Sequence, residues 1–469
     1  MPPLAPSTRV LNVTNPPTSR GNPGFGTPSA HLSDRRLPPR PRYGARCESC
    51  PGHIRRVSNE SSPIDRLAPP AGPPIPSPGA HVTDTTTPPR RVYLDNGGRA
   101  ALHPLARTAF DQAMDEGWAD PRRLYAEARR AARLLDGARE AIAAAIGART
   151  EEVRLAPSHV AALHAAVGAV ALGRRRAGSG IVVSAVERAA VLHAAELAVA
   201  SAGDPDALVK VPVDLLGRVD EAAMAEAVAR PGVALAALQA ANGEVGTVQP
   251  VGAVHAAARG AGVPLLVDAG AVVGHAELPG SWDLLAADPA DWGGPAGVGV
   301  LAVRNRVRWR RTWPEDAEPW FPGGVSVPAA FAAAVALESV LADRAAQDAR
   351  RRAAIDKVRA VVGQVPDVEV VGDPDDRLPH VVTFSFLFVD GEALVTELDR
   401  AGFAVGSGSA CTSSTLEPSH VLAAMGVLTH GNVRIALDRS TTEEDVDRFL
   451  AVLPDAVARV RASLGVSGL

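Results

Sequence analysis

The sequence is poor in cysteine, in lysine and in long apolar runs. Its 469 residues include only 3 cysteines, too few for a disulfide framework, which favours a reducing compartment. No apolar run approaches the ~20 residues of a membrane-spanning helix, and the N-terminus lacks the apolar centre of a signal peptide. The formal net charge of -4 gives no electrostatic reason to expect nucleic acid or a membrane as partner. We therefore expect a soluble, cytoplasmic protein.

Lysine occurs only as Lys210 and Lys357, although the chain holds 48 lysines and arginines together. We interpret this imbalance first as a coding bias. Lys210 is expected in a connection after a strand and Lys357 among the charged residues of a helix, so both should face solvent. Chemistry that needs a buried lysine amine therefore has no evident lysine in this chain.

The N-terminal segment, residues 1–90, has the composition of a disordered tail. It holds 20 of the 40 prolines and shows neither helical nor strand periodicity, so it cannot bury enough apolar surface to fold. It is either a regulatory tail or upstream sequence from a wrongly assigned start, with Val82 near the true beginning. Cys47 and Cys50 form a CxxC there, but no second ligand pair follows at zinc-site spacing, and we interpret them as exposed thiols.

From Val92 onward, short apolar strands alternate with alanine-rich amphipathic helices, which predicts a parallel sheet wrapped by helices. We expect a large domain over residues 91–325 and a smaller α+β domain over 326–469. The expected strands are 181–184, 234–238, 264–268, 299–303, 367–371, 380–389 and 432–437, and the expected helices include 122–146, 160–172, 188–201, 250–261, 329–362, 392–401 and 443–460.

Five motifs in order along this body resemble those of the cysteine desulfurases, within the class V aminotransferase fold. They are VYLDNGG at 92–98, NGEVGTVQPV at 242–251, LLVDAG at 265–270, GSGSACTSS at 406–414 and VRIALDRSTTEEDVD at 433–447. The resemblance covers residues 92–465. It implies the fold type I of pyridoxal-phosphate (PLP) transferases, with a mixed, mostly parallel sheet, and it implies a homodimer.

The resemblance also assigns roles to single residues. Cys411, in a glycine- and serine-rich loop, would accept sulfur as a persulfide. Asp268 would bond the protonated pyridine nitrogen of PLP, while Arg434 would hold the substrate carboxylate and Asn242 would contribute to substrate binding. Each has a structural alternative: Asp268 could cap the next turn, Arg434 could form an ion pair and Cys411 could be an inert thiol.

The lysine of this family is missing from the sequence. Asp291 stands at its position, just before a Gly-Pro turn, and an aspartate can neither form a Schiff base nor supply the amine that moves the substrate proton. Asp288 adds a second negative charge nearby. The glycine-rich segment that reaches the partner subunit's cofactor phosphate is shortened, because Gly323 and Gly324 run almost directly into Ser326.

Further cofactor groups differ as well. The phosphate-binding turn corresponds to Ser158 and His159, followed by a valine in place of the hydroxyl, although Ser158 could still cap a helix and leave amides for an anion. Arg188 replaces the histidine that stacks on the ring, and arginine is too basic to shuttle protons. Ala271 replaces a glutamine, and Gly243 replaces an asparagine.

Weak or absent PLP binding is the expectation that follows. The leading hypothesis is a cysteine desulfurase-like protein without autonomous PLP chemistry. It could carry a persulfide on Cys411, pair with an active homologue, or assist sulfur transfer or iron–sulfur assembly. Two alternatives remain open: an active desulfurase or transferase with an altered PLP site, or a non-catalytic interaction scaffold.

Overall fold

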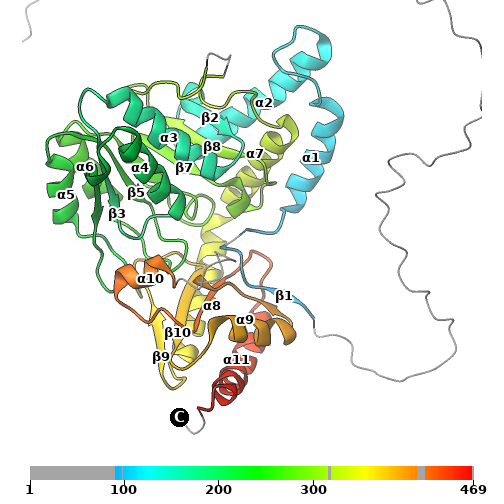
Figure 1. Cartoon of the computed structure of the whole chain (residues 1–469). Coiled ribbons are helices and arrows are strands. Elements are labelled where there is room, and N and C mark those ends of the chain that lie inside the picture. The colour runs from blue at the N-terminus through cyan, green and yellow to red at the C-terminus, as the bar shows by residue number, and fades with distance from the viewer. Residues whose placement is uncertain (1–89, 98, 315–317, 409–417, 467–469) are drawn as a thin grey trace, which may run out of the picture. The chain divides into compact units, whose positions relative to one another are not determined.

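The computed structural model describes residues 90–97, 99–314, 318–408 and 418–466 (Figure 1). The proline-rich residues 1–89 lie outside this part, so their predicted disorder stays a prediction. Cys411 also lies outside the described residues. Within the described part, no helix is both long enough and apolar enough to cross a membrane.

A seven-stranded mixed sheet forms the centre of the larger half, in the order β2-β8-β7-β6-β5-β3-β4. Its strands are β2 (Val153–Ala156), β3 (Gly180–Ser184), β4 (Leu208–Val211), β5 (Val233–Gln239), β6 (Leu265–Asp268), β7 (Leu284–Ala287) and β8 (Gly299–Val303). Strands β4, β3, β5, β6 and β7 are parallel neighbours, whereas β8 is antiparallel to both β7 and β2. The predicted mixed, mostly parallel sheet is confirmed.

Helices cover both faces of this sheet, which explains why β5 is buried along its whole length. On one face α3 (His159–Arg174) and α4 (Ala189–Ser201) pack Leu163 and Val191 into one apolar cluster. On the other face α2 (Ala126–Ala145), α5 (Glu221–Ala229), α6 (Val251–Gly260) and α7 (Val327–Ala342) build a second cluster, and α1 (Pro104–Glu116) packs on α7 and α2. Figure 1 shows these layers.

The expected helix 329–362 is two helices, α7 and α8 (Arg344–Val362), which meet at Asp343. They enter different cores: Leu337 of α7 packs in the cluster of the large sheet, whereas Val358 of α8 packs in the smaller core. The smaller core also takes in Val92, because β1 (Val92–Tyr93) pairs in parallel with β11 (Phe403–Ala404).

The smaller core surrounds an antiparallel three-stranded sheet, in the order β12-β10-β9. Its elements are β9 (Val368–Val371), β10 (Val381–Phe386), α9 (Gly391–Arg400), α10 (His420–Met425), β12 (Asn432–Ala436) and α11 (Glu443–Ser463). Short 3-10 turns η2 (Thr150–Glu152), η3 (Pro205–Ala207) and η4 (Pro289–Trp292) complete the fold.

Three strands of the large sheet were not predicted from the sequence: β2, β4 and β7. Each has four residues, too few to show a clear periodicity. Lys210 therefore lies within β4 rather than in a connection, and its ammonium pairs with Glu196 at 2.9 Å.

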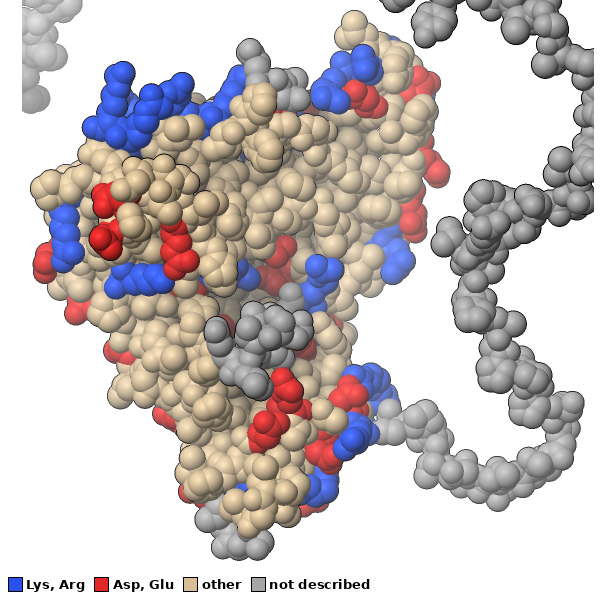
Figure 2. Space-filling model, viewed as in Figure 1, with Lys and Arg blue, Asp and Glu red and all other residues tan. Residues whose placement is uncertain are grey.

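Acidic and basic side chains are interspersed on the face shown in Figure 2, with basic ones gathered along its upper left.

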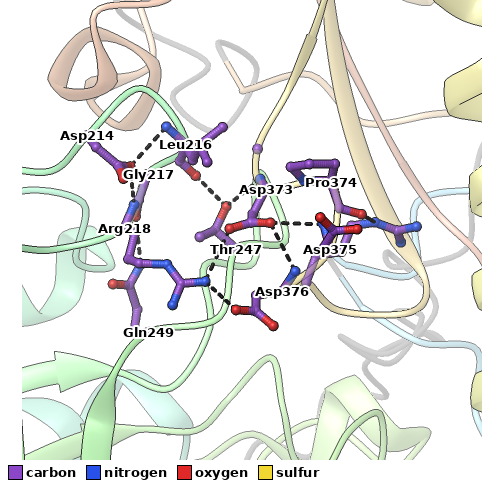
Figure 3. A network of polar contacts seen from close by, with 12 residues as sticks. Asp214, Leu216, Gly217, Arg218, Thr247, Gln249, Asp373, Pro374, Asp375 and Asp376 are labelled. Carbon is purple, nitrogen blue, oxygen red and sulfur yellow. Dashed lines mark hydrogen bonds and ion pairs between the residues drawn. The ribbon is translucent and has the colours of Figure 1, made fainter. Parts of the chain in front are cut away.

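A polar network joins the two halves of the folded body (Figure 3). Arg218, after β4, donates to Asp373 at 3.1 Å and to Asp376 at 2.7 Å, both in the connection from β9 to β10. Buried Thr247 donates to the carbonyl of Leu216 at 2.5 Å and accepts the backbone N–H of Asp373 at 3.0 Å. We call these five residues the Arg218 network.

Candidate functional site

Asp268 is the centre of the candidate site. It ends β6 at the carboxyl edge of the parallel strands, where open α/β sheets commonly bind ligands, and it is 4% exposed. One carboxylate oxygen, Oδ1, lies 3.0 Å from Nε2 of His159 and accepts the backbone N–H of Gly270 at 2.9 Å. Asp268 therefore also caps the turn that follows its strand.

Arg188 engages the second oxygen of Asp268. It is the residue before α4, and its Nε donates to Oδ2 at 3.0 Å. Burial by itself would raise the pKa of Asp268, but the charges of His159 and Arg188 outweigh it and hold that pKa well below its usual range. The structure thus brings together three residues singled out by the sequence analysis, with Asp268 ionised between them.

Asp288 and Asp291 lie beside this group, at the turn η4. The Asp288 carboxylate caps the turn by accepting the N–H of Ala290 at 3.1 Å, and it lies 3.9 Å from Nδ1 of His159. Asp291 is 7% exposed, and within the described residues its carboxyl group has no hydrogen bond or ion pair. Burial, reinforced by the charges of Asp288 and Asp268 against that of Arg188, raises the pKa of Asp291 well above its usual range.

A buried histidine pair supports the backbone of Asp291. His275 donates from Nε2 to the Asp291 carbonyl at 2.7 Å and accepts from Arg351 at Nδ1, 3.1 Å away. Its ring stacks on His380 with centroids 4.1 Å apart. Burial and the charge of Arg351 lower the pKa of His275 to about 3, so this histidine is neutral and its tautomer is fixed by its two partners.

The side chains of Ser158 and Asn242 form hydrogen bonds with backbone groups. Ser158 is the N-cap of α3, and its hydroxyl accepts the N–H of Ala161 at 3.1 Å. Asn242 is 2% exposed; its amide donates to the carbonyl of Val186 and its oxygen accepts the N–H groups of Glu244 and Val245. The Asn242 side chain therefore organises its own loop.

Arg434, on β12, forms an ion pair with Asp95 at 2.7 Å. Its backbone also exchanges two hydrogen bonds with Gly406, at 2.8 and 3.0 Å. A side chain at Gly406 would collide with this pair, because an added Cβ would come within 2.6 Å of Asp95. The ion pair expected as the structural alternative for Arg434 is thus present. The backbone of Arg434 also fixes Gly406, which precedes Cys411 in the sequence.

The residues just before the Cys411 loop are anchored. Ser407 donates to the side chain of Asn432 at 3.0 Å, and the backbone N–H of Gly408 donates to the same oxygen at 2.6 Å. The Glu244 carboxyl packs directly against Gly408, where any larger residue would overlap with it. The position of Cys411 relative to Asp268 is outside what the structure describes.

Glu187 is a candidate that sequence reasoning missed. It is 0% exposed and accepts the backbone N–H of Gln239 at 2.9 Å through Oε1, while its Oε2 has no hydrogen-bond partner among the residues that the structure describes. Burial raises its pKa to about 8, and the charge of Asp268 adds to this shift. The available signal was an acidic residue right after a buried strand, next to Arg188.

Comparison with known proteins decides the family. The model described as "Aminotransferase class-V" matches residues 92–449. This chain belongs to that family. A "Cysteine desulfurase" of Cereibacter sphaeroides is 35% identical over 394 residues, covering 79% of this chain and 97% of the relative. The "Cysteine desulfurase IscS" of Methanosarcina thermophila is 29% identical, with 79% and 93% covered.

Solved structures agree on the fold. A structure titled "NIFS-LIKE PROTEIN" aligns with a TM-score of 0.72 and 24% identity, covering 78% of this chain and 98% of that one. The apo cysteine desulfurase of Thermococcus onnurineus NA1 aligns with a TM-score of 0.67, covering 78% and 94%. Together with the sequence relatives, they support the resemblance to the cysteine desulfurase family.

The residues around Asp268 do not fit PLP, the cofactor that the family suggests. Both Asp268 oxygens already have partners, and the space beside them is filled: a Cβ added at Gly270 would lie 2.6 Å from His159 and 3.0 Å from Arg188. Asp291, at the position of the expected lysine, is a second buried acid.

Neither lysine can replace the missing one. Lys210 pairs with Glu196, and Lys357 pairs with Asp447 and Glu443. Both side chains are well exposed, at 45% and 39%, whereas the Asp268 site is buried. No reaction step through PLP follows from this arrangement.

Proposed function

We propose that this chain is a cysteine desulfurase-like protein without autonomous PLP chemistry. The observation that carries the proposal is Asp291, a buried carboxyl group at the position where the family resemblance expects the Schiff-base lysine. The closed group of Asp268, His159 and Arg188 supports it, because Asp268 has no free oxygen left for a ring nitrogen.

We propose a role in sulfur transfer or iron–sulfur assembly, in which Cys411 receives sulfur made elsewhere. The Cys411 thiolate would attack the outer sulfur of a donor persulfide. A new S–S bond would form on Cys411 while the donor's S–S bond breaks, and the donor would leave as a thiolate. The retained loop motif and the anchoring of Ser407 and Gly408 support this role. A cytoplasmic homodimer, or a heterodimer with an active homologue, would suit it.

Absorbance spectroscopy tests the loss of cofactor chemistry. The purified full chain is incubated with excess PLP, freed of unbound cofactor, treated with borohydride and then assayed with L-cysteine for sulfide. We expect no retained chromophore, no reduced adduct and no sulfide. A matched variant, Lys210→Arg with Lys357→Arg, contains no lysine and should give the same spectrum as the natural chain.

A retained chromophore with sulfide release would contradict the proposal and favour an active enzyme with an altered site. If the lysine-free variant kept both signals, the activity would run without a lysine aldimine. Sulfur carriage is tested separately, by incubating a Cys47→Ser, Cys50→Ser variant with a persulfide-loaded desulfurase and measuring the mass. A gain of one sulfur that is lost in Cys411→Ser supports the carrier role, and no gain refutes it.

A further inference from the structure

Two arginine-rich stretches that are far apart in the sequence form one surface at the carboxyl end of α3. Four of their arginines are exposed and have no ion pair within the described residues: Arg175, Arg176, Arg308 and Arg310. Together with the exposed Trp313, we call them the α3 arginine surface. Figure 2 shows basic side chains gathered at its upper left, in the part of the view where Figure 1 shows α3.

Backbone contacts hold the two stretches together. The N–H of Arg310, in the segment after β8, donates to the Ala169 carbonyl of α3 at 2.9 Å. A Cβ added at Gly173 would lie 2.5 Å from the Cα of Trp309, so the close approach of the two backbones requires glycine there. The arginines on either side of this contact are therefore held near one another by the fold.

The arginines of the segment after β8 differ in how their charges are matched. Arg304 and Arg306 pair with buried carboxylates at 2.9 and 2.8 Å. Arg308 has no ion pair within the described residues and lies near Arg174, the last residue of α3. Burial, reinforced by the charge of Arg308, lowers the pKa of Arg174. Positive charges gathered without acids repel one another and attract a polyanion.

The residue types of the α3 arginine surface select the kind of polyanion. A guanidinium group donates two parallel hydrogen bonds to a phosphate. Trp313 is 56% exposed and is the third residue after Arg310, so it lies within about 10 Å of it along the chain. An exposed indole ring beside phosphate-binding groups suits an unpaired base, which can stack on it. A duplex keeps its bases stacked on one another, and an acidic protein segment offers no base.

We propose that the α3 arginine surface binds single-stranded nucleic acid, with its guanidinium groups on the phosphates and Trp313 stacked on a base. The net charge of -4, which gives no reason to expect nucleic acid, sums over the whole chain, whereas binding depends on the local field. The surface is separate from the candidate site. The 16 residues of α3 put about 24 Å between His159, which contacts Asp268, and Arg174 at the other end. The inference therefore does not depend on the proposed function.

Fluorescence anisotropy with the full chain tests the surface, using labelled oligothymidylate and oligouridylate of about 15 nucleotides. We expect both single strands to bind at least about tenfold more tightly than a duplex or a polyglutamate of similar length. The double variant Arg175→Ala with Arg308→Ala should make the dependence of log K on log salt concentration shallower by about 1.4, because each phosphate contact contributes about 0.7. The matched control is Arg107→Ala with Arg133→Ala, at exposed arginines of α1 and α2 that also have no ion pair within the described residues. It should keep the slope of the natural chain.

The stacking role of Trp313 is tested in the same titration. Trp313→Leu should weaken binding by about fivefold or more, whereas Trp313→Phe keeps an aromatic face and should retain most of the affinity. Equal losses in the two variants would contradict base stacking.

Three results would overturn the inference. Polyglutamate binding as tight as that of the single strands would favour an acidic protein as partner. Equal slopes in the two double variants would show that binding is not located at the α3 arginine surface. No binding by the natural chain would mean that the surface is neutralised, by Glu315 and Asp316, which lie outside the described residues. A preference for oligothymidylate or for oligouridylate would support the inference and identify the nucleic acid as DNA or RNA.

Discussion

The Arg218 network and the site around Asp268 both gather aspartates near one arginine, but they differ in how the carboxylates are matched. Asp373 accepts the backbone N–H groups of Asp375 and Asp376 at 2.9 Å, and its second oxygen takes Arg218. At the other site Asp291 has no such partner within the described residues. The pKa of Asp373 is accordingly lowered, against the effect of its burial, whereas that of Asp291 is raised.

This difference separates structural from functional acids. A carboxylate with every oxygen engaged stabilises the fold and leaves nothing for a ligand. A buried acid with an unengaged oxygen weakens the fold, and such groups concentrate at binding and catalytic sites. Glu187 and Asp291 belong to the second kind, and the following predictions test that division.

Glu187 should give the largest effect, seen as a pH dependence. Its folded-state pKa of about 8 exceeds the ordinary 4.5, so the folded state holds the proton more tightly, and stability is lost as pH rises from 4.5 to 8. The loss has an upper limit of about 5 kcal/mol. In urea unfolding across this range, Glu187→Gln should make the slope shallower by the share due to Glu187, because glutamine does not titrate.

The control for this experiment is Glu226→Gln, since the Glu226 side chain is 78% exposed. It should keep the pH slope of the natural chain. If the slope of Glu187→Gln equals that of the natural chain, Glu187 is ionised in the folded protein, and its classification as an unmatched acid would be wrong.

Asp268→Ala should destabilise the protein by about 3 kcal/mol, because it leaves the buried His159 and the Arg188 guanidinium without their anion. The share due to Arg188 is reduced by solvent, since that side chain is 38% exposed. Urea unfolding at pH 7 measures the change. Asp399→Ala removes an ion pair in which both side chains are 56% exposed, and should cost less than about 1 kcal/mol. Equal losses would mean that Asp268 is no more coupled than a surface residue.

Much of the fold could be predicted because the longer buried strands are recognisable in the sequence as apolar runs. The strand β5 is an unbroken apolar run, and β6 ends in Asp268 at the sheet edge, so both were found from sequence. The break between α7 and α8 was missed, because the apolar pattern continues through Asp343 while the two helices enter different cores. Such a break depends on tertiary packing, which periodicity does not encode.

The site was predictable in its residues but not in its contacts. Asp268, His159 and Arg188 were found through the family motifs, yet the sequence contains nothing that sets the 3.0 Å contacts between them, since they come from three separate elements. Glu187 is a similar case. Its burial depends on the loop of Asn242, whose amide holds the adjacent carbonyl of Val186.

In the Arg218 network, Thr247→Val should cost about 2 kcal/mol, because it keeps the side-chain shape but leaves the Leu216 carbonyl and the Asp373 N–H unpaired. Thr247 is 0% exposed, so water cannot replace the hydroxyl. Thr247→Ser keeps the hydroxyl and should recover most of the loss in the same urea titration. A neutral Thr247→Val would indicate that these contacts do not join the two halves energetically.

Asp291→Asn should give the smallest effect and the opposite sign, a stabilisation of about 1 kcal/mol or less at pH 8. The folded-state pKa of Asp291 is raised, so its ionisation opposes folding increasingly as pH rises above the ordinary value, and asparagine avoids this cost. The gain should shrink as pH falls through 3.8, the ordinary pKa, because the natural carboxyl group is protonated in both states below it. A loss of several kcal/mol instead would mean that Asp291 is matched in solution as Asp373 is.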